Sequence, residues 1–318
     1  MRKKRHLYTL AALIILVIIS SAINQDFFSV SNFVTILRQS GILLILSLGL
    51  TGVVLTGNID LSVGSVAALT GCVCGKLLVA QMSIGTSIML SMGVGVFAGL
   101  CNGILVGVLN LPSFVATYGM NMVVSGLAVI VMNGGVIYGL PEGFTNLGIG
   151  SIKGVPVLII IAGVLFLVLR FLYQYTIFGR RIYMIGYNKQ AARYSGIPCL
   201  KTLLGAYIVC GLTGSLGGIL LTARLNAADA GMSETYGLQI VAAVVLGGTS
   251  LLGGEGSVTG TVMGTFLLTM IVNIMNINGI DSNWQNFALG IIILILVWFD
   301  GLSFRNSLYL SRIRLPPL

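Results

Sequence analysis

Charged residues are scarce in this 318-residue chain, and histidine is almost absent. Only 8% of the residues are Asp, Glu, Lys or Arg, whereas a soluble domain carries roughly a quarter. The single histidine, His6, lies in the basic N-terminus, where it can supply neither a catalytic triad nor a zinc cluster. The sequence therefore argues against a soluble hydrolase and against a zinc enzyme.

Cysteine is also too sparse to suggest a framework of cross-links. The five cysteines are odd in number, and four of them lie in apolar stretches, where a thiol behaves as a small hydrophobic side chain. We therefore expect neither a disulfide nor a metal site. The cysteines are Cys72, Cys74, Cys101, Cys199 and Cys210.

Apolar residues, by contrast, make up 56% of the chain and give a mean hydropathy of +1.03. This composition predicts an all-α polytopic membrane protein with about ten transmembrane helices. The net charge of +9 is explained by basic helix ends beside anionic lipid, so no nucleic-acid partner is expected. The candidate spans are residues 7–23, 35–56, 61–80, 84–109, 114–132, 155–173, 202–222, 238–252, 257–277 and 284–299.

Basic residues set the predicted orientation of these spans. MRKKRH precedes the span at 7–23 without a convincing cleavage site, so we interpret this stretch as a retained first span with a cytosolic N-terminus. Threading ten spans from there places the C-terminus in the cytosol as well. It also places most of the seventeen Lys and Arg residues on the cytosolic side, as the positive-inside rule requires.

A basic polar island at residues 178–201 interrupts the apolar pattern. It contains no acidic residue, and the positive-inside rule places it in the cytosol. Asn188–Ser195 has the pattern of a short helix with an asparagine cap, ended by Gly196 and Pro198. A helix this short is marginal alone, so we expect it to dock on another surface; the alternative is a solvated loop that only sets topology. The basic residues are Arg180, Arg181, Lys189, Arg193 and Lys201.

Glycine recurs at every fourth residue in two spans, which predicts close helix packing in the interior. An offset of 157 residues aligns the two stripes on spans that cross in opposite directions. This predicts an inverted-topology repeat within a single transmembrane domain, with residues 35–133 as one half and 202–300 as the other. Such stripes also arise independently in packed membrane helices. The stripes are Gly95, Gly99, Gly103 and Gly107, and Gly256, Gly260 and Gly264.

Each half also contains a Gly-rich break that carries one acidic residue. Asp60 follows the first span of its half, in TGNIDLSVGS at 56–65, and Glu255 lies in LGGTSLLGGEGS at 246–257. Irregular backbone near membrane depth survives only where protein or water covers it. Each carboxylate is interpreted either as a helix cap or as part of a gate or partner surface.

Three motifs in order, TGNIDLSVGS (56–65), FGRRIYMIGYNKQAARYSGI (178–197) and AAVVLGGTSLLGGEGSVTGTVMG (242–264), resemble the sugar-type permeases of bacterial ABC importers. The likeness is greatest to ribose, xylose and galactose permeases, and it covers residues 35–300. It implies an inner-membrane permease that is not itself an enzyme and needs no cofactor. The implied partners are a cytosolic ATPase that binds ATP and Mg²⁺, an extracytoplasmic sugar-binding protein, and a second copy or a sister permease.

The resemblance also implies roles for particular residues. Residues 188–195 match the coupling segment that the ATPase would move; Ala191 and Ala192 would permit close approach, and Lys189 and Arg193 would offer charge pairing. Tyr187 and Tyr194 depart from the residues usual in the family. The implied coupling residues are Gly186, Asn188, Lys189, Ala191, Ala192, Arg193, Ser195 and Gly196.

A neutral sugar needs polar walls along its path, and eight residues are candidates for the path or its gate. Each of them can equally serve as a hydrogen bond between helices. An ion-coupled secondary transporter is the main alternative function, with Asp60 and Glu255 as its titratable groups. A membrane-embedded enzyme is a third, although no paired carboxylates or HExxH motif occurs within a span. The candidates are Asn58, Asp60, Ser62, Ser65, Asn102, Asn121, Glu255 and Asn273.

Overall fold

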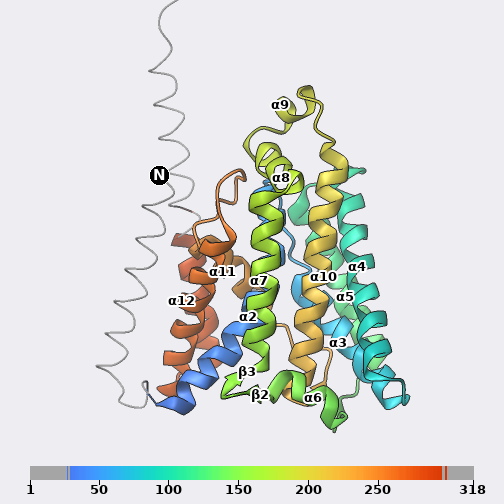
Figure 1. The fold of residues 1–318 in the computed structure, drawn as a ribbon, viewed down its shortest axis with the longest axis vertical. Helices are drawn as coiled ribbons and strands as arrows, with labels where there is room; N and C mark the ends of the chain where they lie inside the picture. The colour runs from blue at the N-terminus through green and yellow to red at the C-terminus, as the bar shows by residue number, and fades with distance from the viewer. Residues whose placement is uncertain (1–26, 28, 296–297, 299–318) are drawn as a thin grey trace, which may run out of the picture.

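The computed structural model describes residues 27, 29–295 and 298, and this part of the chain is mostly helical (Figure 1). Long helices stand side by side, and short helices and two-residue strands lie at the two ends of the bundle. The elements are α2 (Val30–Leu55), α3 (Val63–Val79), α4 (Ile84–Gly107), α5 (Ser113–Met132), β1 (Ile137–Tyr138), α6 (Glu142–Ile149), β2 (Ser151–Ile152), β3 (Val155–Pro156), α7 (Val157–Tyr175), α8 (Ile177–Tyr187), α9 (Lys189–Tyr194), α10 (Cys199–Leu225), β4 (Ala227–Ala228), α11 (Tyr236–Leu246), α12 (Val258–Ile277) and a helix at Ser282–Ile295.

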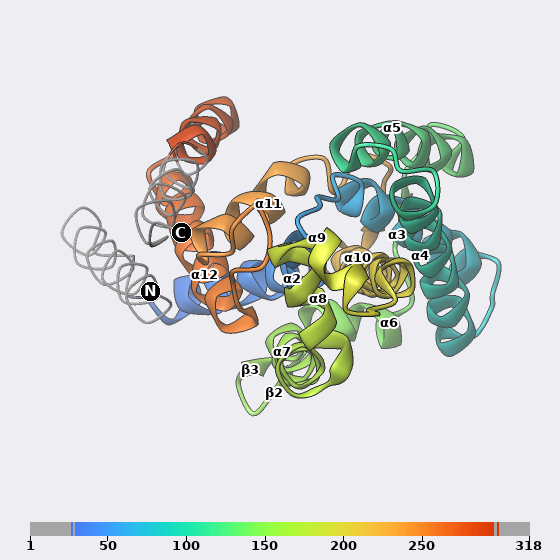
Figure 2. The ribbon, with the colours of Figure 1, turned by 90° about the horizontal axis from the view of Figure 1, so that it is seen from above.

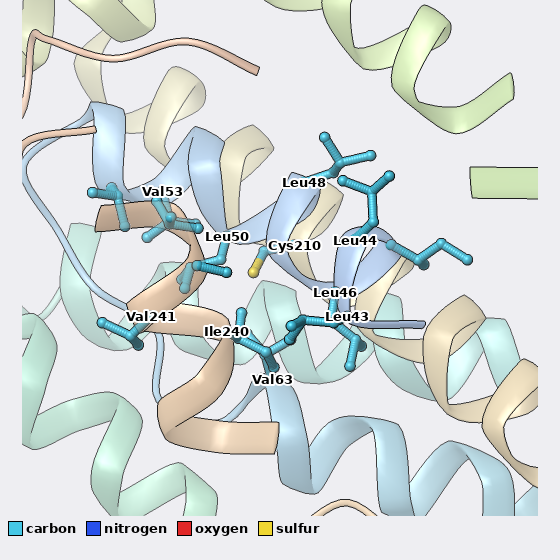
Figure 3. Close-up of a cluster of buried hydrophobic side chains, with 14 of the residues drawn as sticks. Leu43, Leu44, Leu46, Leu48, Leu50, Val53, Val63, Cys210, Ile240 and Val241 are labelled. Carbon is cyan, nitrogen blue, oxygen red and sulfur yellow. The ribbon is translucent and has the colours of Figure 1, made fainter. Parts of the chain in front are cut away.

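α2 runs through the centre of the bundle, with other helices on all sides (Figure 2). Its residues from Ser40 to Leu55 are all buried, as expected for a helix that is apolar around its whole circumference. Figure 3 shows side chains of α2 packed beside Cys210 of α10 and Ile240 of α11. The helix is therefore the central part of the hydrophobic core.

Six of the described helices are long and apolar enough to cross a membrane: α2, α4, α5, α7, α10 and α12. They confirm the prediction of an all-α polytopic membrane protein. The spans predicted at 61–80, 238–252 and 284–299 are represented by the shorter apolar helices α3, α11 and Ser282–Ile295. The span predicted at 7–23 and the C-terminal tail lie outside the described residues, so the count of ten stays a prediction.

α11 has only 11 residues because glycines follow it directly. Gly247 and Gly248 end the helix, and Gly248 has φ of +82°, a left-handed conformation that favours glycine. We call residues 247–257 the second break, and residues 56–62, between α2 and α3, the first break. Both interrupt helical structure where the sequence places its Gly-rich motifs.

The connections between helices gather at two opposite ends of the bundle (Figure 1). At one end lie α8, α9 and both breaks, and the Gly254 N–H donates to the Leu55 carbonyl at 2.9 Å. At the other end lie α6, the β2–β3 hairpin and the short β1–β4 pair. α6 occupies a stretch where the sequence predicts only a connection, and Gly148 lets it approach the backbone of Arg224 at the end of α10.

The glycine stripe of α4 packs against α10. A Cβ at Gly95 or Gly99 would overlap the backbone carbonyl of Gly211 or Tyr207, so these two helices meet backbone to backbone. The second stripe instead faces α11 and the second break, and the inverted repeat stays a prediction. Gly103 and Gly107 also pack against residues of α10. In the second stripe, Gly264 packs against Ala243 and Gly247, the carbonyl of Gly260 packs against Gly247, and Gly256 packs against Thr249.

Candidate functional site

A cavity of about 410 Å³ lies between α3, α5 and the segment that leads into α11. α5 and α11 stand on the same side of the bundle (Figure 2), so the cavity is built from both halves of the chain. Its volume is within the range of small-molecule sites. Two of the eight candidate path residues line it, Ser65 of α3 and Asn121 of α5.

Four further polar residues of this cavity were not among the sequence candidates. Tyr118 and Ser125 lie one turn on either side of Asn121, and the three residues form a polar stripe along α5 at helical spacing. Ser233 and Glu234 come from the loop before α11, and the Ser233 hydroxyl donates to the Gly64 carbonyl at 2.6 Å. The spacing on α5 was visible in the sequence, whereas the position of the loop was not.

The chemistry of this lining suits a neutral, hydroxylated solute. Hydroxyl and amide side chains both donate and accept hydrogen bonds, as sugar hydroxyls do. Glu234, an exposed residue, is the one carboxylate among the described lining residues. Leu61, Ala68, Val129 and Leu238 supply apolar wall between the polar groups.

A second cavity of about 310 Å³ lies between α2, α10, α11 and α12 and includes Arg224, Tyr236 and Gln285. It shares no lining residue with the first cavity and contains none of the eight candidate path residues. The first cavity is therefore the candidate path.

Asp60, Ser62 and Asn102 form one buried polar network beside the first cavity. The Asp60 carboxylate is buried, and its Oδ1 accepts from the Ser62 N–H at 2.9 Å and the Ser62 hydroxyl at 2.7 Å. The Asn102 amide of α4 reaches the two carboxylate oxygens at 3.3 and 3.2 Å. Ser65 links network and cavity, because its hydroxyl donates to the Ser62 carbonyl at 2.9 Å.

The other three candidates lie away from the cavity. The Asn58 amide donates locally, to the Thr56 hydroxyl at 3.0 Å. Asn273 of α12 donates to the Asn32 side chain of α2 at 2.8 Å, a hydrogen bond between helices. Glu255 is half-buried in the second break, at the end of the bundle that carries α8 and α9.

The polar island forms two short helices, α8 and α9, which stand at one end of the bundle (Figure 1). Asn188 caps α9 as predicted, since its side chain accepts from the Ala191 N–H at 3.0 Å. Gly196, with φ of +75°, follows α9. α8 was not predicted as a helix, although Ile182 and Ile185 have the spacing of a buried helical face.

The coupling candidates on α9 divide into exposed and buried residues. Lys189, Ala191 and Arg193 are exposed, whereas Ala192 is only 4% exposed. Ala192 therefore packs mostly against the rest of the chain. An apolar groove of about 330 Å³ lies between α8 and α9; Tyr183, Met184, Tyr187, Asn188, Ala191, Ala192, Ser195 and Ile197 line it.

The cysteines are all unpaired in the structure, and three of them, Cys72, Cys74 and Cys210, are buried. Among the residues that the structure describes, no group of three or more His, Cys, Asp or Glu side chains could hold a metal ion. Neither observation adds a chemical centre to the cavity.

Comparison with known proteins connects this geometry to a family. Residues 32–297 match the family model described as "Branched-chain amino acid transport system / permease component". The chain belongs to this permease family. The match spans both breaks, the cavity and the α8–α9 segment, so the family covers every part of the candidate site.

Individual relatives narrow the type of permease. The ribose import permease protein RbsC of Escherichia coli (strain K12) is 36% identical over 300 residues, which cover 92% of each chain. RbsC of Bacillus subtilis is 39% identical over 290 residues, covering 91% of this chain and 90% of the relative. The autoinducer 2 import system permease protein LsrC of Yersinia pseudotuberculosis is 33% identical, covering 92% of this chain and 83% of the relative. No solved structure matches the chain.

The chain is therefore a permease subunit of a sugar-type ABC importer, and it lies in the bacterial inner membrane. It is a transport subunit and not an enzyme, because ATP hydrolysis in such importers is carried out by a partner. An ATPase and a binding protein complete the importer. Membership of this family decides against the ion-coupled alternative.

Proposed function

We propose that the cavity between α3, α5 and α11 is part of the translocation path for a monosaccharide or a related small polar solute. The observation that carries the proposal is the lining itself, with hydroxyl and amide groups spaced between apolar side chains. The relatives named for ribose import favour a monosaccharide. Residues 35–133 and 202–300 supply the two walls of the path, as the two halves of one permease domain.

The α8–α9 end faces the cytosol and receives the ATPase. Its basic residues and the lack of acidic residues in 178–201 support this orientation. Tyr187 and Tyr194 are 72% and 90% exposed at this end, and large aromatic side chains are typical of partner surfaces. The groove between α8 and α9, with Lys189 and Arg193 beside it, provides the docking surface.

The remaining partners follow from the same orientation. The extracytoplasmic binding protein meets the β2–β3 end, where Asp229, Glu234 and Asp281 offer negative charge to a basic partner surface. A second permease, either this chain or a sister subunit, completes the path in the membrane. The chain itself needs no cofactor, since ATP and Mg²⁺ bind to the ATPase.

Introducing a negative charge on the exposed side of α9 tests the coupling role. We expect Arg193→Glu and Ala191→Glu each to lower ATP-dependent uptake by about tenfold or more, because a like-charge or bulky contact at a docked interface costs several kcal/mol. The measurement is uptake of radiolabelled sugar into proteoliposomes that contain the chain with its ATPase and binding protein. Ala192 is unsuitable for this test because it is buried within the chain.

Lys153→Glu, in the β2–β3 turn at the opposite end, is the matched control, since it makes the same change of charge as Arg193→Glu. It should leave co-purification of the ATPase unchanged, because it lies at the opposite end of the bundle from α9, whereas Arg193→Glu should weaken it. Uptake that continues without ATP and collapses with an ionophore would instead point to an ion-coupled transporter.

Filling the cavity tests the path. Ser65→Phe adds an aromatic ring at a position that is 7% exposed and lines the cavity, so uptake should fall to the background level while the ATPase still docks. Val164→Phe places the same ring on an exposed position of α7, away from the cavity, and should transport normally. Normal uptake by a correctly inserted Ser65→Phe variant would show that the solute passes elsewhere.

A further inference from the structure

We propose that a backbone junction between α8 and the two breaks relays movement of the coupling segment to both walls of the cavity. This glycine junction comprises Gly186 of α8, Gly253 and Gly254 of the second break, and Leu55 and Gly57 at the end of α2. The inference rests on the proposed coupling role of α8 and α9. It identifies Gly186 as a positioning residue for transport, distinct from the docking surface on α9.

The three segments of the junction meet without intervening side chains. A Cβ added to Gly186 would overlap the Leu55 carbonyl oxygen and the Gly254 nitrogen. A Cβ on Gly253 would lie 2.7 Å from the Gly57 Cα and 3.0 Å from the Gly186 Cα, so this residue touches both of the other segments. The hydrogen bond from Gly254 N–H to the Leu55 carbonyl closes the contact at 2.9 Å.

The backbone conformation of the junction is one that glycine adopts readily. Gly57, Gly253 and Gly254 have φ of +77°, +86° and +72°, in the left-handed region that other residues seldom occupy. The close approach and the turn geometry therefore both depend on glycine. Because close-packed backbone has no flexible side chain to absorb a shift, displacement of α8 must displace both breaks.

One route leads from the junction through the first break. The Ile59 and Leu61 N–H groups donate to the Ser113 and Thr117 hydroxyls of α5, at 3.3 and 3.1 Å. The Tyr207 hydroxyl of α10 donates to the Ile59 carbonyl at 3.2 Å. Leu61 itself lines the cavity, as do Asn121 and Ser125 further along α5. A shift of Gly57 therefore reaches the α3 and α5 walls within a few residues.

A second route leads through the second break. The Tyr183 hydroxyl of α8 donates to the Gly256 carbonyl at 3.1 Å, and Gly256 packs against Thr249. The break is braced internally, because the Ser250 N–H donates to the Glu255 carbonyl at 2.9 Å. α11 ends where this segment begins, and Gly237 and Leu238, in the first turn at the far end of the helix, line the cavity. Both walls are thus connected to one point on α8.

The experiment compares Gly186→Ala with wild type in proteoliposomes that contain the ATPase and the binding protein, and measures solute transported per ATP hydrolysed. We expect ATPase binding and hydrolysis to persist, because α9 is untouched, while transport per ATP falls about tenfold. Gly163→Ala on α7, where an added Cβ meets nothing within 4 Å, is the matched control and should keep the wild-type ratio.

Tyr183→Phe covers the case in which Gly186→Ala does not fold. It removes the hydroxyl that bonds Gly256 and adds no volume, so transport per ATP should fall by about two- to tenfold, the range expected for one hydrogen bond.

Hydrogen exchange gives a second readout. When the ATPase and a non-hydrolysable ATP analogue are added to wild type, exchange in residues 56–62 and 247–257 should change. In Gly186→Ala the change should be confined to α8 and α9.

The results separate this inference from the proposed function. Lack of ATP-dependent uptake by wild type would overturn the coupling role itself. If Arg193→Glu abolishes uptake while Gly186→Ala and Tyr183→Phe both keep the wild-type ratio of solute transported per ATP hydrolysed, the relay is overturned. The coupling role of α9 then still holds.

Discussion

Gly99→Val is expected to lower the melting temperature of the purified protein sharply or to prevent folding. A Cβ at Gly99 would overlap the Tyr207 carbonyl oxygen, and it would lie 3.0 Å from the Tyr207 carbonyl carbon and 3.2 Å from the Ile208 Cα. These atoms belong to the α10 backbone, so they cannot rotate away and the two helices must separate. Overpacking of this kind costs about 1–3 kcal/mol where side chains can adjust, and more where they cannot.

Gly93→Val provides the control on the same helix. Gly93 is exposed, and a Cβ there meets nothing within 4 Å, so the variant should melt like wild type. Thermal unfolding in detergent, followed by the loss of monodisperse protein, measures the difference. Equal melting of the two variants would show that α4 and α10 are not packed through this stripe.

Replacing Asp60 by leucine is expected to destabilise the protein by about 3 kcal/mol or more, because buried donors lose their acceptor. The Ser62 N–H, the Ser62 hydroxyl and the Asn102 amide all donate to this carboxylate. Asp60→Asn should cost far less. Asn102 Oδ1 has no partner in the structure, so rotation of this amide can offer it to the new NH₂ group.

Uptake by the two Asp60 variants distinguishes a structural carboxylate from an ion-coupling one. If Asp60 organises the first break, Asp60→Asn should keep ATP-dependent uptake near the wild-type rate, while Asp60→Leu should lose both folding and uptake. Glu142→Gln, at an exposed position in the first turn of α6, controls for the change of charge. A well-folded Asp60→Asn variant without uptake would show that the negative charge itself takes part in transport.

Local sequence signals predicted local structure well. The asparagine cap, the turns of α9 and its end at Gly196 all follow from residues within one short segment. The glycine stripe of α4 correctly marked a helix face of close approach. Hydropathy located the helices, but it placed the C-terminal end of α11 too late. The apolar pattern continues through Gly247 and Gly248, where the helix has already ended.

Long-range arrangement could not be read from the chain in the same way. Gly57, Gly186 and Gly253 are far apart in sequence, and nothing in the local pattern indicates that their backbones touch. For the same reason, the sequence does not show which of the eight polar candidates line the path. Ser65 and Asn121 reach the cavity, whereas Asn273 forms a hydrogen bond with another helix. Ala192, which the resemblance implies as a coupling residue, is mostly buried and also lines the groove between α8 and α9, a position that the local sequence pattern does not indicate.

The glycine junction also restricts which substitutions this sequence can accept during evolution. A contact made by side chains can be repaired by a compensating substitution in a neighbour, whereas a contact between backbones leaves no neighbouring side chain to alter. Gly186, Gly253 and Gly254 therefore have almost no acceptable replacements, although they lie near the surface of the bundle. Variation among importers that adapt to different ATPases should instead accumulate around them, at positions such as Tyr187 and Tyr194, whose side chains extend into solvent.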